Sequence, residues 1–246
     1  MRRLLVPLPA HAPDRVTLEA ERFHYLVHVL RVEVGARLEV FDGAGRSFDG
    51  EVIALGATTA ELSLTGERRA PVPRPITLIQ GLPKADKLEW ILQKATELGA
   101  SAFAPVIAVR SVVKLSVDKA PARHRRWERI AEEAARQSGR SDVPTVAPLG
   151  LLMTTCQAFV QDGTQRLLIL DEDERALTLS EAALSVGPTA PLGLVVGPEG
   201  GFERVEVAEL RSLGAIPVTL GRRVLRTETA GMAAVCILRH LEGVLG

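Results

Sequence analysis

The sequence predicts an α/β protein of two domains: a small strand-rich amino-terminal domain and a larger domain of alternating strands and helices. Short strand-like segments separated by turns occupy the chain up to about residue 70. Further along, short apolar runs alternate with segments of helical periodicity. Residues 70–75 lie between the two patterns, and their prolines fix an extended connector. We therefore predict one domain over residues 1–70 and a second over 71–246.

The first domain has the pattern of a small β-barrel. Residues 37–41 and 60–64 alternate apolar and polar positions, and a turn at 42–45 leads into a further strand at 47–55. Residues 21–30 have helical spacing instead. Several short strands at this interval are typical of a small barrel.

The second domain has the pattern of a mostly parallel sheet covered by helices. Strands are predicted at residues 76–80, 102–109, 166–170, 192–196 and 217–220, and helices at 84–98, 122–138, 202–213 and 229–245. In the first of these helices the apolar residues fall on one face, and Gly99 is placed as its carboxyl-terminal cap. Ligands of such folds bind at the carboxyl ends of the strands.

Composition excludes several classes of protein. Of 246 residues, 46% are hydrophobic and 24% charged, which is ordinary for a folded globular chain and unlike a disordered one. The 30 basic residues balance the 30 acidic ones, so the total charge does not indicate a nucleic-acid partner. No apolar stretch approaches the roughly 20 residues that span a bilayer, and we expect a cytoplasmic protein without a membrane anchor. Two distant cysteines indicate neither a disulfide framework nor a zinc site.

The first candidate site is a glycine-rich turn. Residues 194–202 read LVVGPEGGF, a buried strand that runs directly into glycines and then into a helix. Glycines allow unusual backbone dihedrals and let a ligand approach the main chain. The spacing matches neither a P-loop nor a dinucleotide-binding fingerprint. A tight turn between strand and helix, without a ligand, explains the local pattern equally well.

The second candidate site follows the last predicted strand. Residues 220–232 read LGRRVLRTETAGM, a loop of arginines, threonines and a glutamate before an almost wholly apolar helix. Thr227 is suited to cap that helix, with Glu228 in its first turn. Capping leaves the arginines unexplained, and a solvated surface is the alternative for them. Two loops of this kind after strands of one sheet favour a ligand site over either alternative.

Other segments carry weaker signals. Residues 123–140 are rich in arginine but diluted by glutamates, so they fit RNA phosphates or a solvated helix about equally. His24 and His28 are four residues apart, but no third ligand completes a metal motif, so we predict no metal site. The final helix has too many apolar residues for a surface helix, which favours a core position or a homodimer interface.

Several motifs together resemble one enzyme family. They are HYLVHVLR at residues 24–31, LPKADK at 82–87, QKATELG at 93–99, QSGR at 137–140, GPEGG at 197–201 and LRTETA at 225–230. In this combination the chain resembles the RsmE family of SPOUT-class methyltransferases, which methylate N3 of a uridine in 16S ribosomal RNA. The resemblance covers nearly the whole chain. It implies an α/β SPOUT fold with a carboxyl-terminal trefoil knot, preceded by a PUA-like β-barrel.

The resemblance also implies a cofactor, a partner and site residues. The cofactor is S-adenosylmethionine, the partner is 16S ribosomal RNA or the small ribosomal subunit, and the enzyme is a homodimer through its carboxyl-terminal domain. The expected cofactor-binding residues are Val196, Gly197, Pro198, Glu199, Gly200, Gly201, Leu220, Gly221, Val224, Leu225, Arg226, Thr227, Thr229 and Ala230. The expected RNA-binding residues are Arg2, Arg3, Arg22, His28, Arg31, Arg110, Lys114, Gln137 and Arg140.

Three residues are candidates for the chemical step. Arg226 is the first candidate, because a cation can stabilise negative charge that develops on the uracil carbonyls. Glu228 or Glu199 can accept the N3 proton if burial raises its pKa. Alternatives are a non-catalytic RNA-binding protein, a SPOUT enzyme acting on tRNA or on a ribose 2′-hydroxyl, and an α/β enzyme acting on a small molecule. Cofactor binding, the identity of the modified nucleoside and the presence of a separate barrel distinguish them.

Overall fold

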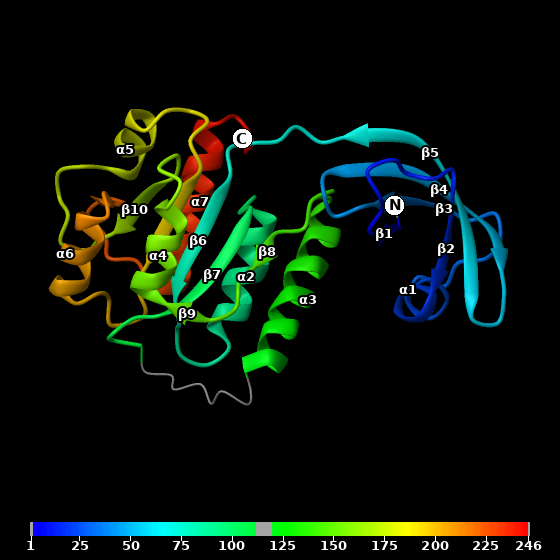
Figure 1. Ribbon diagram of the computed structural model, residues 1–246, viewed down its shortest axis with the longest axis horizontal. Coiled ribbons are helices and arrows are strands. Elements are labelled where there is room, and N and C mark those ends of the chain that lie inside the picture. Colours follow the sequence, from blue (N-terminus) through cyan, green and yellow to red (C-terminus); the bar gives the residue numbers. More distant parts are fainter. Residues whose placement is uncertain (1, 112–119, 246) are drawn as a thin grey trace. The chain divides into compact units, whose positions relative to one another are not determined.

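The computed structural model describes residues 2–111 and 120–245, which fold into two compact units (Figure 1). Unit 1 comprises Met1–Val72 and Ala135–Val143, and unit 2 comprises Pro73–Ala134 and Pro144–Gly246. No helix in the described part of the chain is long and apolar enough to cross a membrane.

Unit 1 is built on a five-stranded sheet with the order β1-β3-β4-β5-β2. Its strands are β1 (Arg3–Leu5), β2 (Arg15–Glu19), β3 (Arg37–Phe41), β4 (Arg46–Leu55) and β5 (Thr59–Arg69). All neighbours are antiparallel except β1 and β3. In β3 the predicted alternation is confirmed, because Leu38 and Val40 are buried while Arg37 is exposed. One face of the sheet therefore forms a core of its own.

The helix predicted over residues 21–30 is interrupted. The structure has the short helix α1 (Ala20–His24), followed by a π-helical turn, η1 (Tyr25–Val29). Leu26 within the turn is completely buried in the core of unit 1. The apolar spacing thus identified a helical segment, but a periodicity of 3.6 residues does not reveal a local widening of the helix.

Residues from the middle of the chain complete unit 1. The Arg3 guanidinium donates hydrogen bonds to the carbonyls of Ala135, Arg136 and Arg140 at 3.0–3.3 Å, and it also pairs with Glu39. The amide of Val143 donates to the carbonyl of Gly43 at 2.9 Å. The long helix α3 (Ala120–Ser138) therefore begins in unit 2 and ends in unit 1.

Unit 2 is an α/β fold with a parallel sheet, as predicted. Its strands are β6 (Ile76–Gly81), β7 (Ala102–Ile107), β8 (Thr145–Val146), β9 (Gly150–Leu151), β10 (Arg166–Leu170), β11 (Leu192–Val196) and β12 (Ile216–Val218). The order is β12-β10-β11-β6-β7-β8, with β9 also paired to β7, and every pairing is parallel. The predicted bounds of β10 and β11 are confirmed. Apart from the exposed Arg166 that begins β10, each of these strands is a continuous apolar run, which is typical of a strand buried on both faces.

Helices cover both faces of this sheet (Figure 1). They are α2 (Lys87–Glu97), part of α3, α4 (Leu152–Val160), α5 (Leu179–Ser185), α6 (Arg204–Ser212) and α7 (Thr227–Leu241). Side chains of α2, α3, α5 and α7 share one apolar cluster, and those of α4 and α6 share another. Within β6 the side chains of Leu78 and Ile79 point into different clusters. The short helices α4 and α5 were not predicted.

The last helix contains a fully buried arginine. Arg239 donates to the carbonyl of Gly99 at 2.6 and 3.0 Å and to that of Arg74 at 2.8 Å, and it pairs with Glu242. Gly99 follows the end of α2 with φ +102°, which confirms the predicted cap, and a Cβ there would lie 3.0 Å from Nε of Arg239. The end of α7 is therefore joined to the segments that precede β6 and β7.

Candidate active site

A pocket of about 450 Å³ lies at the carboxyl ends of β10, β11 and β12. Its walls are the segments that follow these strands: 170–175 after β10, 196–204 after β11 and 218–230 after β12. Lys87, at the start of α2, completes the lining. Ligands of parallel α/β sheets bind at this edge, so the position agrees with the prediction from the strand pattern.

Nearly all of the predicted cofactor-binding residues line this pocket. Those that do are Val196, Gly197, Pro198, Glu199, Gly201, Leu220, Gly221, Val224, Leu225, Arg226, Thr227 and Ala230. Gly200 and Thr229 belong to the same segments but are not among the lining residues. The structure thus brings together two loops that are some twenty residues apart in the sequence.

The glycine turn after β11 requires its glycines. Gly201 has φ +67°, a left-handed conformation that favours glycine. A Cβ on Gly197 would lie 3.1 Å from Cα of Gly201, because the turn folds closely on itself. Arg110, a predicted RNA-binding residue, supports this turn by donating to the carbonyl of Gly200 at 2.8 Å and to Glu203 at 2.9 Å.

Thr227 connects the turn to α7 and to the central strand β6. Its hydroxyl donates to the carbonyl of Gly197 at 2.5 Å and accepts from Nε2 of Gln80, at the end of β6, at 2.9 Å. The prediction that Thr227 caps α7 is wrong: the capping position is Arg226, no side chain caps the helix, and Thr227 is its first residue. The hydroxyl that a cap would use is instead bonded to Gly197 and Gln80, which are distant in the sequence.

Lys87 joins the two candidate glutamates. Its Nζ donates to Oε1 of Glu199 at 3.0 Å and to Oε2 of Glu228 at 3.2 Å. The main-chain amide of Lys84 donates to both carboxylate oxygens of Glu199, at 3.1 and 3.2 Å. We call Lys87, Glu199 and Glu228 the charge cluster.

The charge cluster lowers the pKa of both carboxyl groups. For Glu199 burial acts to raise the pKa, but hydrogen bonds from Lys87 and from main-chain amides outweigh it. For Glu228 the hydrogen bond from its own amide is the largest cause, and Lys87 adds to it. The hydrogen bond to Glu199 raises the pKa of the Lys87 ammonium in turn. The expectation that burial raises the pKa of one glutamate is therefore wrong, because each carboxylate has positive or donor groups beside it.

Arg226 lies in the pocket wall next to this cluster. Its guanidinium forms no salt bridge within the described part of the chain, although its charge contributes to the lowered pKa of Glu228. Its carbonyl accepts from the amides of Thr229 and Ala230 at 2.8 Å, which holds the backbone in place at the start of α7. The Arg226 guanidinium is thus a cation whose backbone is held by hydrogen bonds of the helix that follows.

The pocket is also lined by charged residues that the motifs did not indicate. Arg204 donates to both carboxylate oxygens of Asp171 at 3.0 Å. Burial acts to raise the pKa of Asp171, but the bonds from Arg204 and from the amide of Asp173 lower it overall. Asp171 directly follows the buried strand β10, so its place at a strand's carboxyl end is the signal that could have identified it. Gln80 likewise lies at the end of a strand, β6, and Lys87 begins the helix that follows it.

Among the predicted RNA-binding residues of unit 1, Arg3, Arg140 and His28 make contacts with named side chains. Arg3 binds Glu39 and carbonyls of the segment Ala135–Val143, and its guanidinium lies 4.6 Å from the Phe41 ring centroid. Arg140 pairs with Asp142. His28 is exposed and its ring lies 4.5 Å from that of His24.

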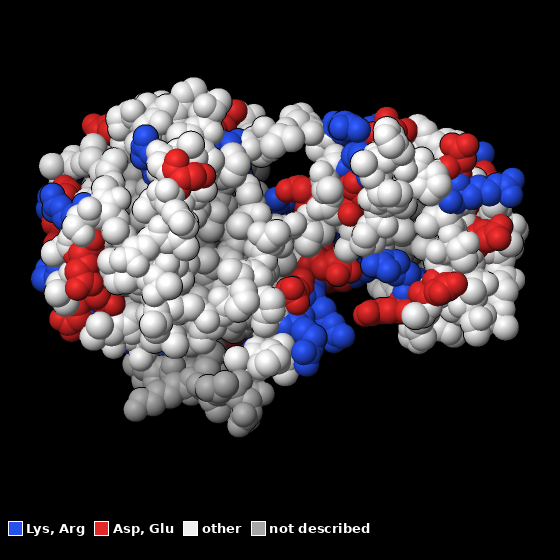
Figure 2. All heavy atoms as spheres, viewed as in Figure 1, with Lys and Arg blue, Asp and Glu red and all other residues white. Residues whose placement is uncertain are grey.

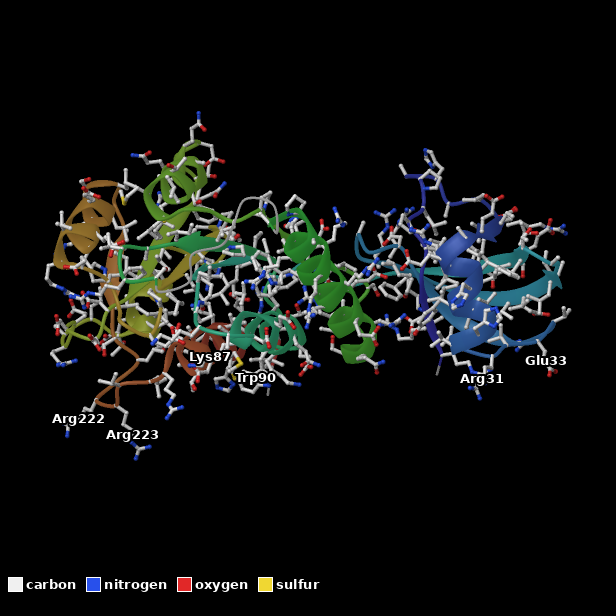
Figure 3. All side chains as sticks on the ribbon, turned by 90° about the horizontal axis from the view of Figure 1, so that it is seen from below. Arg31, Glu33, Lys87, Trp90, Arg222 and Arg223 are labelled. Carbon is white, nitrogen blue, oxygen red and sulfur yellow. The ribbon has the colours of Figure 1, made fainter. Side chains whose placement is uncertain are left out.

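The remaining predicted RNA-binding residues are exposed or not described. Arg2, Arg22, Arg31 and Gln137 are exposed on unit 1, and Figure 3 labels Arg31. Lys114 lies outside the described residues. On unit 2, Arg222 and Arg223 extend away from the loop after β12 (Figure 3). Acidic and basic side chains are otherwise intermingled on the visible face of each unit (Figure 2), in keeping with the balanced total charge.

Comparison with known proteins identifies relatives along most of the chain. Residues 70–239 match a family model described as an RNA methyltransferase domain, and residues 18–65 match one described as an RNA methyltransferase PUA domain. The chain is 35% identical over 236 residues to ribosomal RNA small subunit methyltransferase E of Bacillus subtilis, covering 93% of this chain and 91% of the relative.

Solved structures of similar proteins agree with these matches. The crystal structure of a ribosomal RNA small subunit methyltransferase E from Neisseria gonorrhoeae, bound to S-adenosylmethionine, superposes with a TM-score of 0.85 at 32% identity, covering 98% of each chain. A protein from Legionella pneumophila, solved with bound S-adenosylmethionine, gives a TM-score of 0.81 at 27% identity, covering 97% of each chain.

Proposed function

The chain belongs to the ribosomal RNA small subunit methyltransferase E family of RNA methyltransferases, and on this premise we propose that it transfers a methyl group from S-adenosylmethionine to N3 of a uridine in 16S ribosomal RNA. The observation that carries the proposal is the pocket at the carboxyl ends of β10, β11 and β12. Two of its walls are the glycine turn and the loop before α7, the segments in which the sequence predicts the cofactor site.

The pocket suits S-adenosylmethionine in size and in chemistry. A volume of about 450 Å³ lies within the usual range for small-molecule sites. Val196, Leu220 and Leu225 supply apolar surface for adenine, and the close-packed turn at Gly197 and Gly201 exposes main-chain groups to a ligand. When bound, this cofactor supplies an electrophilic methyl group. The protein's contribution is to hold donor and acceptor in line.

Arg226 is the proposed catalytic residue. N3 of uridine carries a proton, so methylation requires its loss, and negative charge develops on the uracil carbonyl oxygens. The Arg226 guanidinium, which has no salt-bridge partner in the described chain, can stabilise that charge. Glu199 and Glu228 are the proposed proton acceptors, ranked below Arg226 because a carboxylate of lowered pKa is a weaker base.

The target base has to leave its stack to reach such a pocket. We assign RNA recognition around it to residues 1–70, as a PUA-like β-barrel, with Arg2, Arg22, His28 and Arg31 as exposed contacts. Residues 71–246 then form the methyltransferase domain. Arg110, which is bonded to the glycine turn, is a proposed RNA contact beside that turn.

A trefoil knot at the carboxyl end and a homodimer complete the proposal. In support of the knot, the segments after β10 and β12 are paired through Thr178 and Thr219, and α7 returns from the edge strand β12 to pack on α2 and β6. In support of the dimer, Leu241 at the end of α7 and Val244 just beyond it are exposed apolar residues. As an enzyme of ribosomal RNA, the protein would act in the cytoplasm.

Methyl transfer to purified small ribosomal subunits tests this function. The subunits come from cells that lack this protein, S-adenosylmethionine carries the labelled methyl group, and mass spectrometry identifies the modified nucleoside. We expect label in 3-methyluridine of 16S RNA. Label in another nucleoside would overturn the proposed target atom, and binding of RNA without any binding of S-adenosylmethionine would favour a non-catalytic protein.

A further inference from the structure

The charge cluster links two walls of the pocket through one side chain. Glu199 belongs to the glycine turn after β11, Glu228 to the first turn of α7, and Lys87 to the first turn of α2. Nζ of Lys87 contacts both carboxylates, at 3.0 Å from Oε1 of Glu199 and 3.2 Å from Oε2 of Glu228. The side chains are only 35%, 26% and 16% exposed for Lys87, Glu199 and Glu228, so water screens the cluster incompletely.

The structure assigns Lys87 as a positioning residue of the proposed methyl-transfer site: its ammonium holds Glu199 and Glu228 in one arrangement and one charge state, and so joins the glycine turn to the start of α7. This inference rests on the proposed function. Lys87 acts through the two glutamates and need not touch either substrate.

Charge counting explains why a cation is required at this point. Lys87 and Arg226 carry two positive charges, and Glu199 and Glu228 carry two negative ones, so the group is neutral when all four are ionised. Without Lys87, two carboxylates would remain beside a single guanidinium. Two like charges that share a site raise one pKa strongly, so one of the two carboxyl groups would take up its proton at a higher pH than in the unmodified protein.

Other charged groups lie near the cluster or line the same pocket. They are Asp86 beside Lys87, the Glu89–Arg126 pair between α2 and α3, the Asp171–Arg204 pair, and the lining residues Glu172, Arg175 and Arg223. Because these groups remain unchanged when Lys87 is replaced, the change in titration reports on Lys87 itself.

Carboxylate titration in the protein without cofactor is the direct test. Glutamate labelled with ¹³C at the carboxyl carbon gives one NMR resonance per residue, and Glu199→Gln and Glu228→Gln assign the two that matter. We expect both to titrate below the ordinary glutamate range in the unmodified protein. In Lys87→Met at least one should titrate about one pH unit or more higher, and Lys87→Arg should restore the low value.

Two further variants separate charge from other effects. Lys87→Gln keeps a hydrogen-bond donor without the charge, and it should behave as Lys87→Met does. Lys94→Met removes a lysine from the same helix, whose ammonium pairs with Glu97 alone among the described residues, and should leave both resonances unchanged. Unchanged carboxylate titration in Lys87→Met or Lys87→Gln would overturn the inference.

Methyl transfer supplies the second readout. The acid limb of the pH–rate profile should move up by about one unit in Lys87→Met and return in Lys87→Arg. A lower rate at every pH without a shifted limb would indicate a merely structural lysine and would overturn the inference. If Glu199 and Glu228 titrate as expected in the unmodified protein and in the Lys87 variants, but the unmodified protein transfers no methyl group, the proposed function is overturned and the role of Lys87 in the charge cluster stands.

Discussion

Arg226 and Arg3 show how differently two arginines of one chain can be used. Arg226 lines the pocket without a salt-bridge partner in residues 2–111 and 120–245, so its charge is available to a ligand. The Arg3 side chain, by contrast, is only 10% exposed and is bonded to Glu39 and to main-chain carbonyls. The first arginine suits chemistry and the second suits stability.

Replacing Arg226 by alanine should slow methyl transfer by roughly 100-fold, because one preorganised electrostatic partner of a developing charge is typically worth that much. Single-turnover kinetics at saturating cofactor would measure the effect. Arg166→Ala, at the opposite end of β10, is the matched control and should have the normal rate. A normal rate in Arg226→Ala would remove Arg226 from the mechanism.

Replacing Arg3 by methionine should lower the free energy of unfolding by about 3 kcal/mol, because Glu39 and the carbonyls would lose their donor. The hydrogen bond from Arg3 is the main cause that lowers the pKa of Glu39. A carboxyl with a lowered folded-state pKa adds stability above its unfolded pKa, and that stability is lost as the pH falls through the folded value. The variant should therefore lose less stability on acidification.

Denaturant unfolding between pH 7 and pH 3 measures both effects of the Arg3 substitution. Arg2→Met is the control, since Arg2 is exposed and should matter for RNA and not for folding. Equal stability of the two variants would contradict the assignment of Arg3 as a structural residue.

At the scale of elements, the site depends on how α7 begins and ends. At its start, the Thr227 hydroxyl bonds Gly197 and Gln80, so the helix is attached to the glycine turn and to β6. Near its end, buried Arg239 binds the carbonyls of Gly99 and Arg74. The helix that forms one wall of the pocket is therefore held by polar contacts at both ends, in addition to its apolar face.

Replacing Thr227 by valine should lower the free energy of unfolding by about 2 kcal/mol, because the buried Gln80 amide and the Gly197 carbonyl each lose one hydrogen bond. The affinity for S-adenosylmethionine, measured by calorimetry, should fall as well, since the glycine turn and α7 lose the direct hydrogen bond between them. Thr229→Val, at an exposed position of the same helix turn, should keep its stability. Normal stability and affinity in Thr227→Val would show that packing alone aligns the two segments.

At the scale of the whole molecule, α7 presents an apolar stripe that unit 2 does not fully cover. Ala233, Ile237 and Leu241 are spaced by four residues and therefore lie on one face, with Val244 just beyond the helix. Leu241 and Val244 are 42% and 49% exposed. A second copy of the chain is the occupant that the proposed dimer supplies.

Sedimentation equilibrium should give the mass of a dimer, since a stable interface buries on the order of 1,600 Å² and needs such an apolar centre. Leu241→Glu should shift the equilibrium toward monomer by placing a charge in that centre. Val205→Glu, at an exposed position of α6, should leave the dimer intact. A monomer at all concentrations would contradict the proposed assembly.

The sequence by itself determined the features that depend on neighbouring residues. The change from short strands to alternating strands and helices, the bounds of β3, β10 and β11, and the two loops that line the pocket all follow from local periodicity and from glycine. Such features arise within a few residues, because side-chain direction repeats along an element and ligand loops follow strand ends.

Only the tertiary structure decided the partners of the charged and hydroxyl side chains. Arg3, Arg110 and Arg140 form hydrogen bonds within the protein. Thr227 connects α7 to the glycine turn and does not cap the helix, and Lys87 lies between Glu199 and Glu228. Their partners are mostly far away in the sequence, and a side chain's charge state depends on what surrounds it in space. Spacing along the chain therefore identifies which residues can do chemistry, whereas the folded chain decides which of them are free to do it.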